Sequence, residues 1–195
     1  MRNFLLTIPY VFIVYGFYFL FQRIGLKRGA RELDEGFAAK ISYNPRWVWV
    51  YSGIYYPIMC TPCFLTDTKG MLVVWFSGIV LTALQAPFFI FYPIKTPKYW
   101  RQSNPKNVSE WVLIKLVQGV DGPSNCFPSM HVSVATLVGL HLCQILGSIW
   151  YTPIALFPIL IGWSCLKTKQ HYVVDLLPAP ILGGVAYVIS RYVLW

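Results

Sequence analysis

Two short segments hold the residue types that could perform chemistry in this chain. One is a Pro-Ser-Met-His motif at residues 128–131, and the other, at residues 164–175, carries His171 and Asp175. Each histidine lies at the end of a long apolar run, where a membrane helix would meet water. We expect the two imidazoles to meet across a single phosphate group, with the rest of the chain holding them together or selecting the lipid that reaches them.

The Pro-Ser-Met-His motif has the composition of a helix N-terminus. Proline suits the first turn of a helix because its missing N–H is not needed there. Ser129 and the free backbone N–H groups of that turn would then face outward at the positive helix end, where anions bind. His131 would stand at the edge of this site, where an imidazolium could protonate a leaving oxygen. The alternative is a capped helix with an interfacial histidine that has no chemical role.

The second segment pairs a histidine with a carboxylate. His171 and Asp175 are four residues apart, so on a helix they share one face, and the carboxylate could accept the Nδ1 proton and leave Nε2 as a nucleophile. Ser164 and Lys167 continue this spacing, so an unbroken helix would place all four residues in one stripe. Lys167 would then point toward the site and Lys169 away from it. The chain must reverse here, which could break the stripe, and the alternative role is a His–Asp pair that anchors a helix end.

Composition indicates a membrane protein with strongly basic aqueous segments. Of the 195 residues, 56% are hydrophobic and 12% are charged, and the formal net charge is +9. These values exclude a solvated globular domain with a polar shell. A basic surface can bind nucleic acid, anionic head groups or a phosphorylated substrate. We expect no nucleic-acid partner, because the chain has no long basic soluble domain studded with aromatic residues.

Uncharged runs predict an all-α integral membrane protein, a six-helix bundle with its active site at one membrane interface. A spanning helix needs about 20 mainly apolar residues. The whole chain would form one membrane domain, with spans at about residues 3–22, 47–66, 70–94, 128–147, 149–166 and 175–195. The dipeptide Gly147-Ser148 marks the expected break between the fourth and fifth spans.

Six spans would place both termini on one face of the membrane and both histidine segments on the other. Of the 16 Lys and Arg residues, all but Arg2, Lys69 and Arg191 would share the histidine face. The positive-inside rule would make that face cytoplasmic, whereas a site built for an anion needs cations on either side. We expect a bacterial inner-membrane protein with its active face on the periplasmic, outer side, and the cytoplasmic side is the alternative.

The two segments resemble the type 2 phosphatidic acid phosphatase superfamily, which comprises integral membrane lipid phosphatases and phosphotransferases. The family pattern is Lys-x6-Arg-Pro, then Pro-Ser-Gly-His, then Ser-Arg-x5-His-x3-Asp. Here the second part reads Pro-Ser-Met-His, and the third reads Ser164-Cys165-x5-His171-x3-Asp175. The surrounding residues resemble the subgroup that includes inositol phosphorylceramide synthase-like members. The resemblance covers a catalytic half at about residues 90–190.

The resemblance implies a role for each matching residue. His171 would be the nucleophile that forms a phosphohistidine, Asp175 would orient and activate it, and His131 would protonate the leaving group and later help to activate the acceptor. Ser129 and nearby backbone N–H groups would hold phosphate oxygens. No metal and no other cofactor is expected. The expected partners are a lipid phosphate or diphosphate substrate and the surrounding membrane lipids, with no obligate protein partner.

The chain departs from the family pattern in both histidine motifs. Met130 replaces the glycine of the second part, a change that the related subgroup also tolerates. Cys165 stands where the family has a phosphate-binding arginine, and a thiol cannot supply that charge. We therefore expect either that Lys167 or Lys169 supplies the charge or that the site binds phosphate more weakly. We expect Ser164 to remain in the substrate-binding set.

The first part of the family pattern is degenerate in this chain. Three cations follow the third expected span, and we rank them as phosphate ligands in the order Lys95, Arg101 and Lys98. The alternative for each is a cation that extends from a helix end to the interface.

The motifs predict a lipid phosphate or diphosphate phosphatase that works through a phosphohistidine. One alternative is a lipid phosphotransferase that passes the phosphoryl or head group to an alcohol acceptor, since the first half-reaction is the same. Another is a non-catalytic lipid-phosphate carrier with the same fold.

Overall fold

The computed structural model describes residues 2–101 and 104–194, with side chains from residue 7 onward. Within these residues the chain forms helices and no β-strand, and one isolated bridge joins Arg31 to Ile94. The prediction of an all-α chain is therefore confirmed.

Long helices alternate with short helical turns. The long elements are α1 (Arg2–Lys27), the π-helical turn η2 (Trp49–Ile54) that continues into α3 (Tyr55–Leu65), α4 (Thr68–Phe91), α7 (Met130–Leu146), α8 (Tyr151–Lys167) and α10 (Ala179–Leu194). The short elements are α2 (Phe37–Lys40), η1 (Pro45–Trp47), η3 (Lys98–Trp100), α5 (Val108–Trp111), η4 (Val112–Val117), α6 (Gln118–Val120), η5 (Ser148–Trp150) and α9 (Val173–Leu176).

Four helical stretches of the described chain are long and apolar enough to cross a membrane. They are Thr7–Lys27, Thr68–Phe91, Ser148–Lys167 and Val173–Leu194. Helix α7 is apolar but has 17 residues, and α3 has 11. A helix of that longer length measures about 26 Å, somewhat less than the ~30 Å hydrocarbon core of a bilayer. The structure thus fits an integral membrane protein, and the count of six spans stays a prediction.

Local sequence explains where several helices begin and end. The Asp67 side chain caps α4 by accepting the Gly70 N–H at 2.7 Å. Gly147 ends α7 with a φ of 85°, in the left-handed region that glycine adopts without strain, at the position where the sequence predicts a break. Helix α1 runs beyond residue 22 to Lys27, because cations at a helix end can extend toward water.

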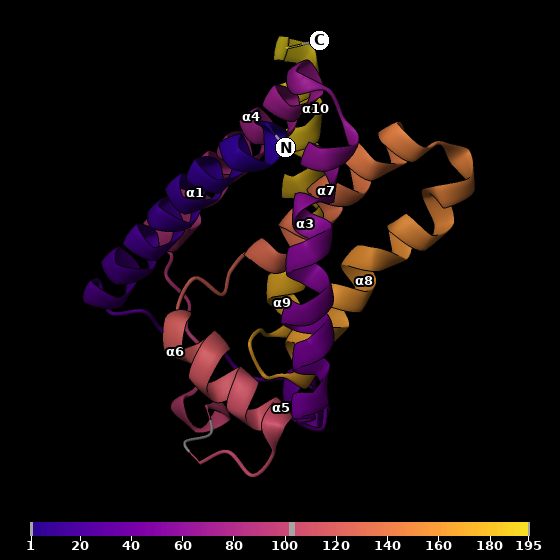
Figure 1. Ribbon diagram of the computed structural model, residues 1–195. Coiled ribbons are helices and arrows are strands. Elements are labelled where there is room, and N and C mark those ends of the chain that lie inside the picture. Colours follow the sequence, from indigo (N-terminus) through magenta and orange to yellow (C-terminus); the bar gives the residue numbers. More distant parts are fainter. Residues whose placement is uncertain (1, 102–103, 195) are drawn as a thin grey trace.

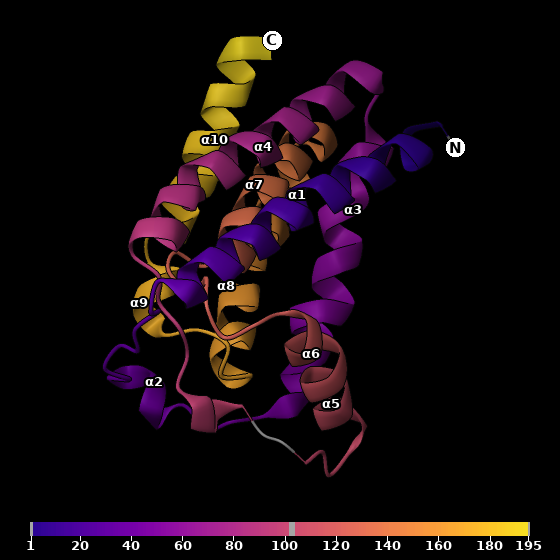
Figure 2. The same ribbon diagram turned by 90° about the vertical axis from the view of Figure 1, so that its left-hand side faces the viewer.

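Helix α7 is the central element of the bundle. It packs against α3, α4, α8 and α10, and α1 lies along α4 (Figures 1 and 2). Buried Leu81, Leu137 and Ala186 join α4, α7 and α10 in one apolar cluster. Many large apolar side chains on the outer faces are exposed, including Phe12 and Ile159, as expected for helices that contact lipid.

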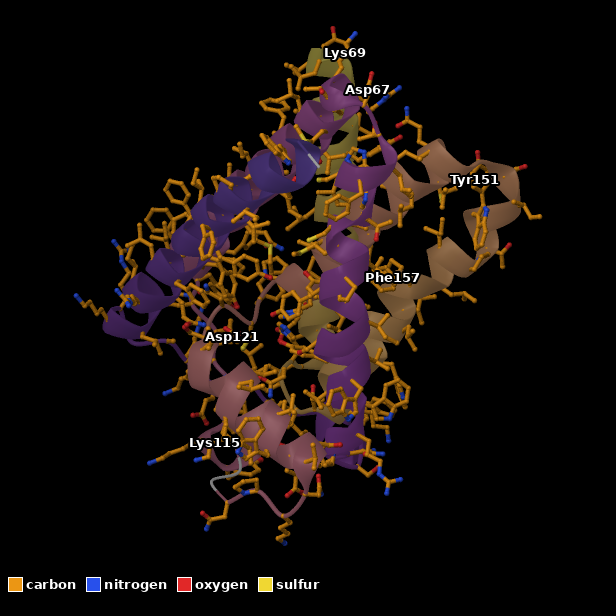
Figure 3. All side chains as sticks on the ribbon, viewed as in Figure 1. Asp67, Lys69, Lys115, Asp121, Tyr151 and Phe157 are labelled. Atoms are coloured by element: carbon orange, nitrogen blue, oxygen red, sulfur yellow. The ribbon has the colours of Figure 1, made fainter. Side chains whose placement is uncertain are left out.

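The two ends of the bundle differ in what they carry. Both chain ends lie at one end, together with the turn that holds Asp67 and Lys69, whereas α5, α6 and Lys115 lie at the other (Figures 1 and 3). The N-terminus of α7 points toward this second end (Figure 1). Both histidine motifs and most of the basic residues therefore belong to the half of the molecule opposite the chain ends.

Candidate active site

The two histidine motifs are joined by a backbone hydrogen bond at the start of α7. Ser129 caps the helix, and its Oγ accepts the Val132 N–H at 3.5 Å. Its own N–H donates to the Asp175 carbonyl oxygen at 2.9 Å. Because Asp175 belongs to α9, this bond fixes the N-terminus of α7 against the second motif, and the free N–H groups of the first turn lie at the same place.

The two imidazoles lie in an edge-to-face arrangement at this junction. The ring centroids of His131 and His171 are 5.9 Å apart, with the planes inclined by 67°. Both side chains are buried, and Ser129 Oγ lies 3.2 Å from His171 Nε2. Reacting atoms must approach to about 3–3.5 Å before bonds can form. Rings whose centroids are this close can therefore both reach the same bound group.

The hydrogen bonds of His171 indicate which ring nitrogen carries the proton. Nδ1 lies 3.0 Å from the Cys126 carbonyl oxygen and 3.3 Å from Asp175 Oδ2. Both partners are acceptors, so Nδ1 carries the proton and Nε2 keeps its lone pair. Asp175 is fully buried, and its Oδ2 also accepts the Tyr172 N–H at 2.8 Å, as a residue in the first turn of α9 can. The pair is thus held by a local turn and by the segment that precedes α7.

The rings of two tyrosines pack against the His131 imidazole. The Tyr51 hydroxyl lies 3.3 Å from His131 Nδ1, and the ring centroids of the two residues are 4.3 Å apart. The Tyr55 ring lies 5.0 Å from the same imidazole. Sequence analysis did not select either tyrosine, because they lie in an uncharged run typical of a span. Their spacing of four residues, which places both rings on one helix face, is the signal that could have pointed to them.

The position of the family arginine is occupied by a small apolar contact in this chain. Cys165 is fully buried in a cluster with Tyr51, Tyr55, Ala135, Phe157 and Ile161. The neighbouring Ser164 is also buried, and its Oγ donates to the Ile161 carbonyl oxygen of its own helix at 2.7 Å. On this side of the site, aromatic rings and a thiol therefore stand where the family pattern has a cation.

The helical stripe that would continue from Ser164 to Asp175 does not form. Helix α8 ends at Lys167, and Lys169 has a φ of 58°, in the left-handed region. The Gln170 N–H bonds back to the Cys165 carbonyl oxygen at 2.9 Å, which closes the helix end and reverses the chain. His171 and Asp175 are brought together by the turn into α9 instead of by an extension of α8.

The two lysines proposed to replace the arginine contact the 38–42 segment. Lys167 Nζ donates to Ser42 Oγ at 3.1 Å, and Lys169 Nζ donates to the Ala38 carbonyl oxygen at 2.6 Å. Lys169 also lies over the Trp100 ring, with Nζ 4.9 Å from its centroid. Burial lowers the pKa of Lys169. The charge of Glu35 opposes this shift, and the charge of Lys167 adds to it. The structure does not place either ammonium group against the histidines.

The three cations of the degenerate first motif separate in the structure. Lys95 Nζ lies 3.7 Å from Glu32 in a partly exposed ion pair, and Lys98 is exposed at the start of η3. The Arg101 guanidinium donates to the carbonyl oxygens of Asp121 at 3.0 Å and Gly122 at 2.6 Å. Arg101 is therefore held by the segment that leads directly to the Pro-Ser-Met-His motif, whereas Lys95, which sequence analysis ranked first, is not.

Helix α1 holds the same segment from the other side. Asp121 (labelled in Figure 3) accepts hydrogen bonds from the Tyr18 hydroxyl at 3.0 Å and from Gln22 Nε2 at 2.8 Å. Asn125 Nδ2 donates to the Tyr18 carbonyl oxygen at 3.0 Å. Desolvation raises the pKa of the Asp121 carboxyl, and its two hydrogen bonds and the neighbouring Arg101 guanidinium oppose that shift only in part. Sequence analysis named none of these positioning residues, because their partners are about a hundred residues away along the chain.

Among the residues that the structure describes, one group of potential metal ligands coincides with the site. Ligand atoms of Cys126, His171 and Asp175 lie within 4.8 Å of one another. Metal binding would require the His171–Asp175 hydrogen bond to open and the Cys126 thiol to ionise, but burial raises the pKa of that thiol well above its usual value. The donor set therefore does not suit a metal ion.

The fold and the site together define an all-helical membrane protein in which two histidines and a carboxylate meet at one end of a bundle. The family model of the PAP2 superfamily matches residues 35–189, which is well over half of the 195 residues. The chain belongs to the PAP2 superfamily. Membership supports an enzyme of the phosphatase or phosphotransferase kind. Neither the curated proteins nor the solved structures gave a significant match.

The packing at Cys165 predicts the effect of restoring the family arginine. Cys165→Arg would bury a guanidinium among aromatic rings without a partner, so we expect a loss of several kcal/mol of stability and no faster phosphate release. Thermal unfolding of the detergent-purified protein measures the loss, and Cys165→Ala, which removes the thiol and adds no charge, should cost about 1 kcal/mol. An arginine variant that unfolds at the wild-type temperature and releases phosphate faster would contradict this description of the pocket.

Proposed function

We propose that the chain is a membrane lipid phosphatase that acts on lipid phosphates or diphosphates through a phosphohistidine intermediate. The observation that carries the proposal is the pair of buried imidazoles 5.9 Å apart, of which His171 has its lone pair at Nε2, where Ser129 Oγ lies 3.2 Å away. A nucleophile and a proton donor on opposite sides of one phosphate are what an in-line displacement requires.

The first step transfers the phosphoryl group to the enzyme. His171 Nε2 attacks phosphorus, the bond from phosphorus to the leaving oxygen breaks, and its electron pair departs with that oxygen. His131 gives its Nε2 proton to the leaving oxygen. Asp175 offsets the positive charge that develops on the His171 ring, because its Oδ2 lies 3.3 Å from Nδ1.

The second step returns both histidines to their starting state. Water attacks the phosphohistidine and gives a proton to His131 Nε2, while the nitrogen–phosphorus bond breaks and its electron pair returns to His171. Ser129 Oγ, 3.2 Å from His171 Nε2, and the backbone N–H groups of Met130 and His131 in the first turn of α7 are placed to hold phosphate oxygens.

An internal apolar cavity supports a lipid as the substrate. A cavity of about 70 Å³ lies between α1, α3, α4 and α7, and Met130, next to His131, lines it. A second cavity of about 260 Å³, between α1 and α3, shares the lining residues Thr7, Val11 and Cys60 with the first. A hydrocarbon chain that entered this space would extend from the reacting phosphate toward the opposite end of the bundle.

We further propose that the active end faces the periplasm of a bacterial inner membrane. The cations at this end contact loops and carbonyl oxygens around the site, so their number does not by itself indicate a cytoplasmic face. In Lys115→Cys, a membrane-impermeant maleimide added to intact spheroplasts should label the new thiol, since Lys115 is exposed at this end. Labelling that appears only after the membrane is broken would place the site in the cytoplasm.

A second candidate is head-group transfer to an alcohol. None of the five cations expected to neutralise a phosphate is seen to contact the imidazoles. Lys95, Arg101, Lys167 and Lys169 contact other groups, and Lys98 is exposed. A site with little positive charge suits a singly charged phosphodiester better than a doubly charged monoester. The resemblance to inositol phosphorylceramide synthase-like members points the same way, with an alcohol taking the place of water in the second step.

Substitution of the two histidines tests the covalent route. We expect His171→Ala to abolish both phosphate release and the acid-labile label that a ³²P-labelled lipid phosphate leaves on the protein. His131→Ala should reduce turnover by about 10²–10⁴-fold, the contribution of a general acid. The control is His141→Gln, whose native ring bonds Ser77 at 2.9 Å in the other half of α7, and it should keep the label. Turnover retained in His171→Ala would remove the covalent mechanism.

A labelled donor separates hydrolysis from transfer. The protein would be incubated with a ³²P-labelled lipid phosphate, and separately with a phosphodiester lipid labelled in its head group, with and without ceramide or diacylglycerol. Hydrolysis predicts free phosphate from the first donor whether or not alcohol is present. Label that moves only to the added alcohol would establish the transferase instead. A phosphate mimic that binds without turnover of any donor would indicate a carrier.

A further inference from the structure

The contact between Tyr51 and His131 has two separable parts. The rings lie 4.3 Å apart and the tyrosine is 1% exposed, so the first part is packing. The second part is a hydrogen bond of 3.3 Å between the hydroxyl and Nδ1. The turn η2 (Trp49–Ile54) positions this hydroxyl, at the point where the chain enters α3.

Packing alone does not account for the hydroxyl. Tyr55 already covers the His131 ring at 5.0 Å, and no polar bond accompanies that contact. Tyr51, Tyr55 and Cys165 belong to one buried cluster in which apolar groups predominate. In such surroundings a phenylalanine would pack as well as a tyrosine, and a buried hydroxyl is tolerated because it has a partner.

We propose that Tyr51 is a positioning residue for His131, whose Nδ1 it engages so that Nε2 is the nitrogen presented to the phosphate. This inference rests on the proposed function, in which His131 transfers a proton at Nε2. The imidazolium carries a proton on each ring nitrogen, and the Tyr51 oxygen accepts the one on Nδ1. Without that acceptor, the ring could rotate or leave a buried N–H unpaired.

The same bond serves both halves of the reaction. When Nε2 gives its proton to the leaving oxygen, Nδ1 keeps its proton and its bond to Tyr51, so the neutral ring has its lone pair at Nε2. That lone pair then takes a proton from the attacking water, which restores the imidazolium. Tyr51 neither gains nor loses a proton in the cycle. Its function for His131 parallels that of Asp175 and the Cys126 carbonyl for His171.

The absence of a cation at position 165 makes this bond more important. With Cys165 in the pocket, position 165 supplies no positive charge to a bound phosphate, so in the proposed mechanism the proton carried by His131 matters more. A misplaced ring would therefore cost both the proton donor and the electrostatic contact. This predicts that the hydroxyl contributes most when the leaving group depends on protonation.

The leaving group provides the test. Tyr51→Phe removes the hydroxyl and keeps the ring, and turnover would be measured with octyl phosphate, a poor leaving group, and p-nitrophenyl phosphate, which departs without protonation. We expect kcat/KM, which reports the steps up to departure of the leaving group, to fall by about 10- to 100-fold for octyl phosphate and by less than about threefold for p-nitrophenyl phosphate. The value of kcat for p-nitrophenyl phosphate is not the readout, because hydrolysis of the phosphohistidine also uses His131 in the proposed second step.

The matched control is Tyr55→Phe, in which the same ring contact to His131 is kept and no bond to it is lost. This variant should keep the wild-type ratio of the two rates. Equal losses on both substrates in Tyr51→Phe, or the same ratio change in Tyr55→Phe, would show a structural role and overturn the proposal.

An NMR measurement tests the Tyr51–His131 hydrogen bond without an activity assay. The chain has three histidines, so ¹⁵N-histidine labelling gives a spectrum that can be assigned with single substitutions. The Nδ1 resonance of His131 should shift in Tyr51→Phe and stay in place in Tyr55→Phe. If wild-type protein turned over no substrate, the proposed function would fail, whereas an unshifted His131 resonance in Tyr51→Phe would reject the positioning role itself.

Discussion

The hydrogen bond from the Ser129 N–H to the Asp175 carbonyl oxygen, 2.9 Å long, is the contact on which the site depends. It joins the cap of α7 to the first turn of α9, two elements that are 46 positions apart in the chain. Because it uses main-chain atoms, its geometry follows from where the two helices begin and not from any one side chain. The helix N-terminus, the His131 ring and the His171–Asp175 pair are all placed by it.

Sequence analysis could predict the parts of the site that depend on short-range spacing. His171 and Asp175 are four residues apart, and the Pro-Ser-Met-His motif marks a helix start, so local rules suffice for both. The meeting of the two histidines followed from the resemblance and from the expected alternation of spans, and the structure places the rings 5.9 Å apart. The details differ from the local rules. The turn into α9, and not a shared helix face, brings His171 and Asp175 together, and Pro128 lies before the Ser129 cap of α7 instead of in its first turn.

The remaining contacts depend on tertiary structure and could not be obtained in this way. Lys167 and Lys169 have long flexible side chains, and their partners at residues 38–42 lie more than a hundred positions away. Sequence analysis ranked Lys95 above Arg101 as a phosphate ligand. The hydrogen bonds from Arg101 to the carbonyl oxygens of Asp121 and Gly122, which reverse that order, are visible only in the structure. Tyr51 lies in an uncharged run where any aromatic residue satisfies the pattern. Sequence periodicity specifies which face of a helix is buried, but not which group that face meets.

The hydrogen bonds of α1 have a consequence for how much of the chain forms the catalytic unit. The family match begins at residue 35, after α1 has ended, yet Tyr18 and Gln22 of that helix hold Asp121 and Asn125 just ahead of the Pro-Ser-Met-His motif. A fragment trimmed to the matching region would keep every motif residue and lose the groups that brace one of the two motifs. If the proposed function holds, the part of the chain needed for activity therefore includes α1, although the family match begins after that helix.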